Sequence, residues 1–189
     1  MYKTFQDYRK AWDSAYTKDP PIALCLDIEL ASVCDLKCPF CFIPNPDFEK
    51  MILEKSDDGR PRARLMPTDM ALNLIDQAAN IGIPSLKFNW RGESTLHPDY
   101  SKILKHAKYK RQETKGEFPD GSKYTAYEPA FFDLLINSNF NFKSHALEGV
   151  LQATKIMVSL DSCNRETHSK MRVGANFDRV VTNIKKVLE

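Results

Sequence analysis

Three cysteines fall within eight residues of this 189-residue chain, at Cys34, Cys38 and Cys41. On an α-helix this C-x3-C-x2-C spacing would align all three thiols on one face. Pro39 lies among them, however, and a proline inside a helix removes a backbone hydrogen bond and clashes with the preceding turn. We therefore expect a loop wrapped around a metal centre. Three thiolates suit a cubane iron–sulfur cluster and leave its fourth iron open to a small molecule.

A zinc site is the main alternative for these thiols. A zinc knot would take its fourth ligand from Cys163, His97 or His168, and three buried thiols without a metal are a further alternative. Zinc loops usually pair C-x2-C with a second such pair, and the sequence has no second pair. The spacing, together with the aromatic Phe40 before the last cysteine, favours the cluster.

Hydrophobic periodicity predicts an alternation of strands and helices along the chain. Strict alternation over 22–30 is typical of a strand, and the other predicted strands are 86–90, 134–138 and 156–161. Helices are predicted over 2–16 with an aromatic face, over 68–81 capped by Thr68, from about 98, over 143–151, and after the capping residue Asn176. Residues 109–129 are polar and rich in turn residues, which indicates a long surface insertion.

Strands that alternate with helices predict an α/β fold with a parallel sheet of right-handed βα units. Ligands of such folds bind at the carboxyl ends of the strands. The segments that follow Leu30, Trp90, Ser138 and Asp161 are therefore expected to meet at one site.

The cysteine loop, placed after a strand that ends in Ile28-Glu29-Leu30 and carrying Phe40, resembles the signature of the radical S-adenosylmethionine (SAM) superfamily. The resemblance implies a [4Fe-4S] cluster on the three cysteines. It also implies that the open iron is chelated by the amino and carboxylate groups of SAM, and that Phe40 lies near the adenine.

Three later segments extend the resemblance. Trp90-Arg91-Gly92-Glu93-Ser94 is similar to the family's Gly-Gly-Glu-Pro loop, which implies that Gly92 and Glu93 receive the ammonium group of SAM. Ile136-Asn137-Ser138-Asn139 resembles the family's Thr-Asn-Gly segment, with Ser138 in the threonine position. Val158-Ser159-Leu160-Asp161, followed by Met171-Arg172, resembles the motif whose serine and arginine reach the ribose and the carboxylate. These residue types suit those groups chemically.

The sequence departs from the family pattern at three positions, Arg91, Ser94 and Phe140. Arg91 replaces a glycine, and either a contact to ligand or substrate or a salt bridge at the rim would account for it. Phe140 replaces a glycine after Asn139, where a bulky side chain resists a positive φ.

The resemblance implies a partial (β/α)6 barrel with four parallel βα units. We expect an amino-terminal helix over 1–20 and an incomplete core domain over 21–189 that lacks the carboxy-terminal strands. A continuing chain or a partner chain is then expected to cover the open sheet edge.

Three further side chains have open roles. Cys25 alternates with apolar neighbours and is expected to be a core thiol. Glu29 shares its strand face, and points into the site or bonds to backbone. Cys163 follows the fourth strand, and either an idle thiol or a role in hydrogen-atom transfer fits its position.

Composition narrows the class of protein. The chain is 42% apolar and 28% charged, as in ordinary globular proteins, and its net charge of +2 does not favour nucleic acid. The sequence contains neither an apolar run long enough to span a membrane nor a signal peptide, so a cytoplasmic location is expected. In that reducing compartment an odd number of clustered cysteines indicates metal or redox chemistry.

The expected function is that of a radical SAM enzyme. The reduced cluster would cleave SAM to a 5'-deoxyadenosyl radical that abstracts hydrogen from a substrate. The resemblance implies an electron donor such as a flavodoxin or ferredoxin, and by analogy favours a peptide or protein as substrate. No catalytic residue beyond the cofactor contacts is identified. The alternative is a zinc- or cluster-binding interaction fragment without catalysis.

Overall fold

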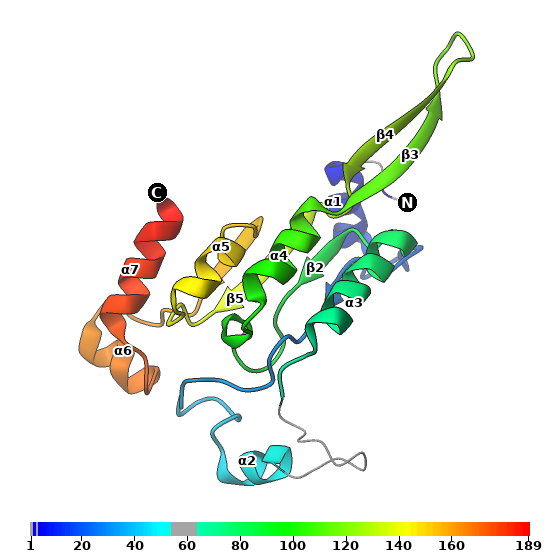
Figure 1. Ribbon diagram of the computed structural model, residues 1–189. Helices are drawn as coiled ribbons and strands as arrows, with labels where there is room; N and C mark the ends of the chain where they lie inside the picture. The colour runs from blue at the N-terminus through cyan, green and yellow to red at the C-terminus, as the bar shows by residue number, and fades with distance from the viewer. Residues whose placement is uncertain (1, 3, 54–63) are drawn as a thin grey trace.

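A computed structural model describes residues 2, 4–53 and 64–189 (Figure 1). Its main sheet has the strand order β1-β2-β5-β6, and every neighbouring pair is parallel. These strands are β1 (Leu26–Asp27), β2 (Ser85–Lys87), β5 (Asp133–Ser138) and β6 (Lys155–Val158). The helices are α1 (Phe5–Ser14), α2 (Pro46–Leu53), α3 (Thr68–Ile81), α4 (Tyr100–Tyr109), α5 (Leu147–Val150), α6 (Arg165–Met171) and α7 (Phe177–Leu188). The predicted α/β architecture with parallel βα units is confirmed.

The hydrophobic core lies between this sheet and helices α3, α4, α5 and α7. Along β5 burial alternates, so Leu134, Ile136 and Ser138 face the helices while Leu135 and Asn137 face the other side. Ile75 of α3 and Ile103 of α4 are fully buried against the strands. Figure 1 shows these helices lying side by side along the sheet. One face of the sheet is thus left for the open interior of the partial barrel.

Two helices match their predicted positions closely. The helix predicted over 68–81 is α3, and Gly82 ends it in the left-handed conformation with φ 82°. Helix α7 begins after Asn176, whose side chain accepts a hydrogen bond from the backbone N–H of Arg179. The prediction that Thr68 is the cap of α3 is wrong. Thr68 is the first helical residue, and its hydroxyl donates to Asp99 Oδ2 at 2.6 Å.

The strands are shorter than predicted. Only Leu26 and Asp27 of the segment 22–30 pair with β2, although the predicted alternation holds, with Leu24, Ile28 and Leu30 buried. One further bond to β2 follows, from the N–H of Ile28 to the carbonyl of Lys87, and the carbonyl of Leu30 then accepts the N–H of Met66 instead. The predicted helix over 143–151 is a 3-10 turn (Ser144–Ala146) followed by the short α5.

Two further segments differ from expectation. Residues 109–129 form an antiparallel hairpin, β3 (Arg111–Glu117) and β4 (Lys123–Pro129), which projects away from the sheet (Figure 1). Its polar residues alternate too weakly to signal a strand, because both faces are largely exposed. In the predicted aromatic helix Tyr8 is buried against Phe132, whereas Tyr16 lies beyond the end of α1 and is exposed. No helix in the described ranges is long and apolar enough to cross a membrane.

Candidate active site

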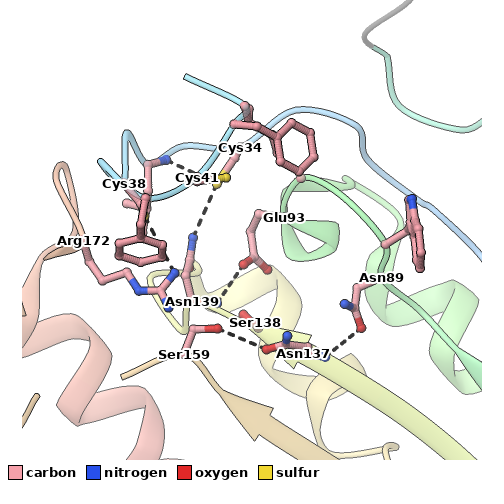
Figure 2. Close-up of a pocket in the computed structure, with 16 residues that line it drawn as sticks. Cys34, Cys38, Cys41, Asn89, Glu93, Asn137, Ser138, Asn139, Ser159 and Arg172 are labelled. Atoms are coloured by element: carbon pink, nitrogen blue, oxygen red, sulfur yellow. Dashed lines mark hydrogen bonds between the residues drawn. The ribbon is translucent and has the colours of Figure 1, made fainter. Parts of the chain in front are cut away.

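All the side chains that the sequence assigned to a cluster or to SAM line one cavity of about 320 Å³, within the size range of small-molecule sites. They are Cys34, Phe40, Gly92, Glu93, Ser138, Ser159 and Arg172, together with Cys38 and Cys41. Among the side chains labelled in Figure 2, the cysteines come from the loop after β1, Glu93 from the loop after β2, Ser138 from the end of β5, Ser159 from the segment after β6, and Arg172 from the end of α6. The predicted convergence at the carboxyl ends of the strands is therefore present, while the role of each residue stays a prediction.

The three cysteines lie in an irregular loop, as Pro39 requires. Within it the backbone N–H of Cys41 donates to the carbonyl of Cys38 at 3.0 Å, and the N–H of Leu36 donates to Cys34 Sγ at 3.4 Å. The backbone N–H of Lys37 donates to the carbonyl of Val173 at 2.8 Å, so the loop is tied to the segment after α6. Local turns and this tie to Val173 help to hold the thiols at the cavity.

The environment of the thiols suits a bound cationic metal centre. Burial raises the pKa of the Cys34 thiol to about 12, and burial also raises the pKa of Cys38, against an opposing effect of Arg172. Thiolates in such a place need a positive metal centre to offset desolvation. Among the described residues no three Cys, His, Asp or Glu side chains are grouped as ligands for a single metal ion.

None of the three side chains named as a fourth ligand for zinc lines the cavity that holds the thiols. His97 is buried, with Nε2 2.7 Å from the carbonyl of Met66 and Nδ1 accepting from the N–H of Asp99. His168 is fully buried, and its ring packs edge-on against Phe177. Cys163 is exposed and does not line the cavity. The thiol loop therefore fits a polynuclear cluster better than a four-ligand zinc knot.

Glu93 is a buried carboxylate that opens into the cavity. Its Oε2 accepts the backbone N–H of Asn139 at 2.8 Å, and its Oε1 accepts the N–H of Thr95 at 3.2 Å and the hydroxyl of Thr95 at 2.7 Å. Burial raises the pKa of Glu93, while hydrogen bonds from Asn139, Thr95 and Ser138 act in the opposite direction. None of the described ion pairs includes Glu93. A fixed, buried acceptor of this kind suits a cationic group such as an ammonium.

Gly92 allows the loop that carries Glu93 to touch the cysteine loop. Its φ is 54°, and a Cβ there would lie 2.2 Å from the carbonyl oxygen of Ala31 and 2.6 Å from that of Val33. The N–H of Glu93 donates to the same Val33 carbonyl at 2.8 Å. Glycine at this position is thus explained by close backbone approach.

Arg91 forms the salt bridge that was one of its two predicted roles. Its Nε donates to Glu29 Oε2 at 2.9 Å, its Nη2 to Oε1 at 3.0 Å, and its backbone N–H to Oε2 at 3.0 Å. Glu29 does not line the cavity. Of its two predicted roles the structure shows the hydrogen bond to backbone, and through Arg91 this carboxylate clamps the loop after β2. Cys25, on the same strand face, is half-buried rather than a core thiol.

In the loop after β5 a residue other than glycine adopts the left-handed conformation. Phe140 has φ 58°, its N–H donates to Ser138 Oγ at 3.0 Å, and its ring is buried against Phe142. The side chain of Asn183 on α7 donates to the carbonyls of Phe140 and Phe142, each at 2.9 Å. These contacts hold the geometry that the sequence had placed in doubt.

Arg172 borders the cavity but is already paired. Its Nε and Nη2 donate to the two oxygens of Asp161 at 2.5 and 3.0 Å. Its guanidinium lies 5.0 Å from the centre of the Phe40 ring, and its Nη1 is 3.7 Å from Cys38 Sγ. The side chain thus joins the aromatic ring and one thiol, a position that sequence reasoning did not anticipate.

Sequence reasoning gave no role to three asparagines that line the same cavity, Asn89, Asn137 and Asn139. Ser159 Oγ donates to Asn137 Oδ1 at 3.1 Å, and the N–H of Asn137 donates to Asn89 Oδ1 at 3.0 Å. Asn139 joins Glu93 to the cysteine loop (Figure 2). Asn89 could have been found, because it falls on the inward face of its predicted strand, where an uncharged polar residue has no packing role.

Comparisons with known proteins agree with this geometry. The sequence profile described as "Radical SAM superfamily" matches residues 28–189. The chain is 29% identical over 166 residues to a probable GTP 3',8-cyclase of Saccharolobus islandicus strain M.14.25, a match that covers 87% of this chain and 43% of the relative. The probable GTP 3',8-cyclase of strain M.16.27 matches this chain with the same identity and coverage. The chain thus spans less than half the length of the curated relatives it matches.

Solved structures share the fold. SuiB of Streptococcus suis bound to SAM superposes with a TM-score of 0.61 at 18% identity, covering 96% of this chain and 35% of SuiB. SuiB bound to its precursor peptide SuiA gives a TM-score of 0.59 at 18% identity, covering 96% and 34%. The sheet and its helices are accordingly part of a (β/α)6 barrel, in a family whose enzymes use a [4Fe-4S] cluster and SAM. The chain belongs to the radical SAM superfamily.

Proposed function

We propose that this chain carries the cofactor site of a radical SAM enzyme, with Cys34, Cys38 and Cys41 holding a [4Fe-4S] cluster beside a SAM site. The observation that carries the proposal is the meeting of three thiols and the buried carboxylate of Glu93 in one cavity. When bound and reduced, the cluster would supply one electron for the cleavage of SAM to methionine and a 5'-deoxyadenosyl radical, which would take a hydrogen atom from a substrate. The protein contributes binding, orientation and exclusion of water.

Different residues of the cavity would contact different parts of SAM. Glu93 would accept the ammonium group, and Gly92 lets the loop that carries Glu93 pack on the backbone of the cysteine loop. The hydroxyls of Ser138 and Ser159 face the ribose. Phe40 would pack on the adenine, and Arg172, which lies beside that ring and Cys38, would pair with the methionine carboxylate.

A peptide or protein is our first proposal for the substrate class. It is supported by the shared fold of SuiB, which was solved with a precursor peptide. The relatives described as probable GTP 3',8-cyclases make a nucleoside triphosphate the second candidate, on 29% identity. The side of the sheet that would face either substrate carries the pair Lys87 and Asp27, 3.3 Å apart, with the exposed Trp90 beside it. This surface suits a polar substrate with at least one flat or apolar part.

A flavodoxin or ferredoxin is the proposed electron donor. The cysteine loop reaches the surface, with Phe40 and Phe42 about half exposed beside the thiols. Exposed apolar side chains next to a redox centre are suited to brief docking of a small donor protein.

The test is anaerobic reconstitution of the full chain with iron and sulfide, followed by reduction in the presence of SAM. We expect about four irons per chain for a [4Fe-4S] cluster, a brown chromophore, and formation of methionine and 5'-deoxyadenosine measured by mass spectrometry. Cys38→Ala should lose all three. Cys163→Ala is the matched control, because that thiol is exposed and outside the cavity.

Two results would contradict the proposal. One equivalent of colourless metal with no response to SAM would identify a zinc module. A stable cluster that yields no 5'-deoxyadenosine in wild-type protein would identify a cluster-binding fragment without catalysis.

A further inference from the structure

Asn139 lies at the centre of a hydrogen-bond bridge between the cysteine loop and Glu93. Its backbone N–H donates to Glu93 Oε2 at 2.8 Å. Its side-chain Nδ2 donates to Asp35 Oδ1 at 2.8 Å and lies 4.0 Å from Cys34 Sγ. Asn139 is almost completely buried. One residue therefore contacts both the carboxylate and the thiol loop.

The orientation of the Asn139 amide is fixed by its neighbours. Its Oδ1 accepts the backbone N–H of Asn141 at 2.8 Å, so its NH2 group must face Asp35 and Cys34. The other carboxylate oxygen of Asp35 accepts Nδ2 of Asn141, also at 2.8 Å. With both oxygens of Asp35 and the amide oxygen of Asn139 occupied, the N–H groups cannot rotate away from the sulfur.

Asn141 anchors the bridge to the rest of the fold. Its Oδ1 accepts the backbone N–H of Asn176, the residue that caps α7. The bridge therefore runs from Glu93 through Asn139 and Asp35 to the start of a long helix. A loop held at this many points keeps its groups in place when the charge of a bound centre changes.

We propose that Asn139, oriented by Asp35, is a positioning residue that fixes the Cys34 thiolate relative to Glu93 and sets the reduction potential of the cluster. The inference rests on the proposed function above. An N–H group directed at a ligating sulfur stabilises the more negative, reduced cluster, and a nearby carboxylate destabilises it. The amide of Asn139 lies beside both groups and is the donor that partly offsets the charge of Asp35.

Two substitutions test the opposing effects. Asn139→Ser keeps a short side chain that can still accept the N–H of Asn141, but it removes the amide donor near Cys34. Asp35→Asn keeps an acceptor for Asn139 and removes the negative charge. We expect Asn139→Ser to make the reduction potential more negative and Asp35→Asn to make it less negative. A tenfold change in the reduction equilibrium corresponds to about 59 mV for this one-electron couple.

Asn183→Ala is the matched control. Asn183 is also a buried asparagine, and it supports the same loop through the carbonyls of Phe140 and Phe142 without a contact to the cysteine loop. It should lower the thermal stability of the apoprotein and leave the reduction potential unchanged. A purely structural role for Asn139 would make its variant behave in the same way.

The measurement is a potentiometric titration of the reconstituted full chain, followed by electron paramagnetic resonance of the reduced cluster, with apoprotein melting and SAM affinity in parallel. SAM affinity should change less than threefold in Asn139→Ser, because the backbone N–H to Glu93 remains. If wild-type protein binds the cluster and SAM, but the two variants shift the potential in the same direction or not at all, the inference is wrong. Failure of wild-type protein to bind the cluster would instead refute the proposed function.

Discussion

Substitution of Gly92 by alanine tests whether close backbone contact builds this site. A Cβ at this position would lie 2.2 Å from the Ala31 carbonyl and 2.6 Å from the Val33 carbonyl, and both are backbone atoms that cannot rotate away. The left-handed φ of 54° costs a non-glycine residue roughly 1–2 kcal/mol, and forced displacement of packed groups adds roughly 1–3 kcal/mol. We expect the free energy of unfolding to fall by about 2–5 kcal/mol.

Gly121→Ala separates these two costs. Gly121 has φ 83°, and nothing lies within 4 Å of the position of its Cβ, so its variant carries the backbone cost alone. In urea unfolding of the apoprotein the midpoint of Gly92→Ala should fall further than that of Gly121→Ala, by roughly 0.5–1.5 M for an m-value of about 2 kcal/mol/M. Equal midpoints would show that the loop after β2 does not rest on the cysteine loop, and the reasoning would fail.

Three further outcomes are expected around the same loop. Glu93→Gln should weaken SAM binding about tenfold to a hundredfold, since a hydrogen bond to a charged group contributes roughly 1.5–3 kcal/mol; calorimetric titration measures it, and unchanged affinity would exclude the ammonium contact. Burial raises the pKa of Glu93 above its ordinary value of 4.5, so the folded protein holds this proton more tightly than the unfolded chain. The contribution of Glu93 to the free energy of unfolding of the apoprotein should therefore be largest below pH 4.5 and should be lost as pH rises through the folded pKa. Urea unfolding at a series of pH values measures this dependence, and Glu93→Gln should reduce it. Glu29→Gln weakens the clamp on Arg91 and should cost about 1–2 kcal/mol of unfolding free energy, whereas no loss would mean that this half-exposed ion pair contributes nothing.

Hydrophobic pattern predicted the parts of the fold that depend on one buried face. Helix α3 ends at Gly82 as expected, because an apolar stripe and a left-handed glycine are both local signals. The hairpin β3–β4 escaped prediction because exposed polar strands lack such a stripe, and the cross-strand pairing that stabilises them is non-local. Helix α6 was missed for a related reason, since His168 is its one fully buried described side chain.

The candidate site, too, could be predicted only in part from the sequence. Loops at the ends of parallel strands must meet, so the sequence could predict that Cys34, Glu93 and Ser159 share a cavity. It could not predict the pairing of Arg172 with Asp161 or the bridge through Asn139, because such hydrogen bonds depend on side-chain directions set by tertiary packing. Asp35, adjacent to the first cysteine, is itself exposed, so burial of its charge gave no local signal of the bridge.

At Phe140, backbone strain and side-chain packing have opposite effects on the free energy of unfolding. Its φ of 58° would be relieved in Phe140→Gly by roughly 1–2 kcal/mol. Its ring is almost fully buried against Phe142, and loss of a buried phenylalanine costs roughly 3–5 kcal/mol. The cavity left in the core therefore outweighs the relieved strain, and Phe140→Gly should lower the free energy of unfolding by roughly 1–4 kcal/mol even though it restores a residue suited to this conformation. A gain in stability in urea melts would show that strain dominates here. A loss would mean that the ring, with Ser138 and Asn183 holding the backbone on either side, is what keeps this loop in the shape that the site requires.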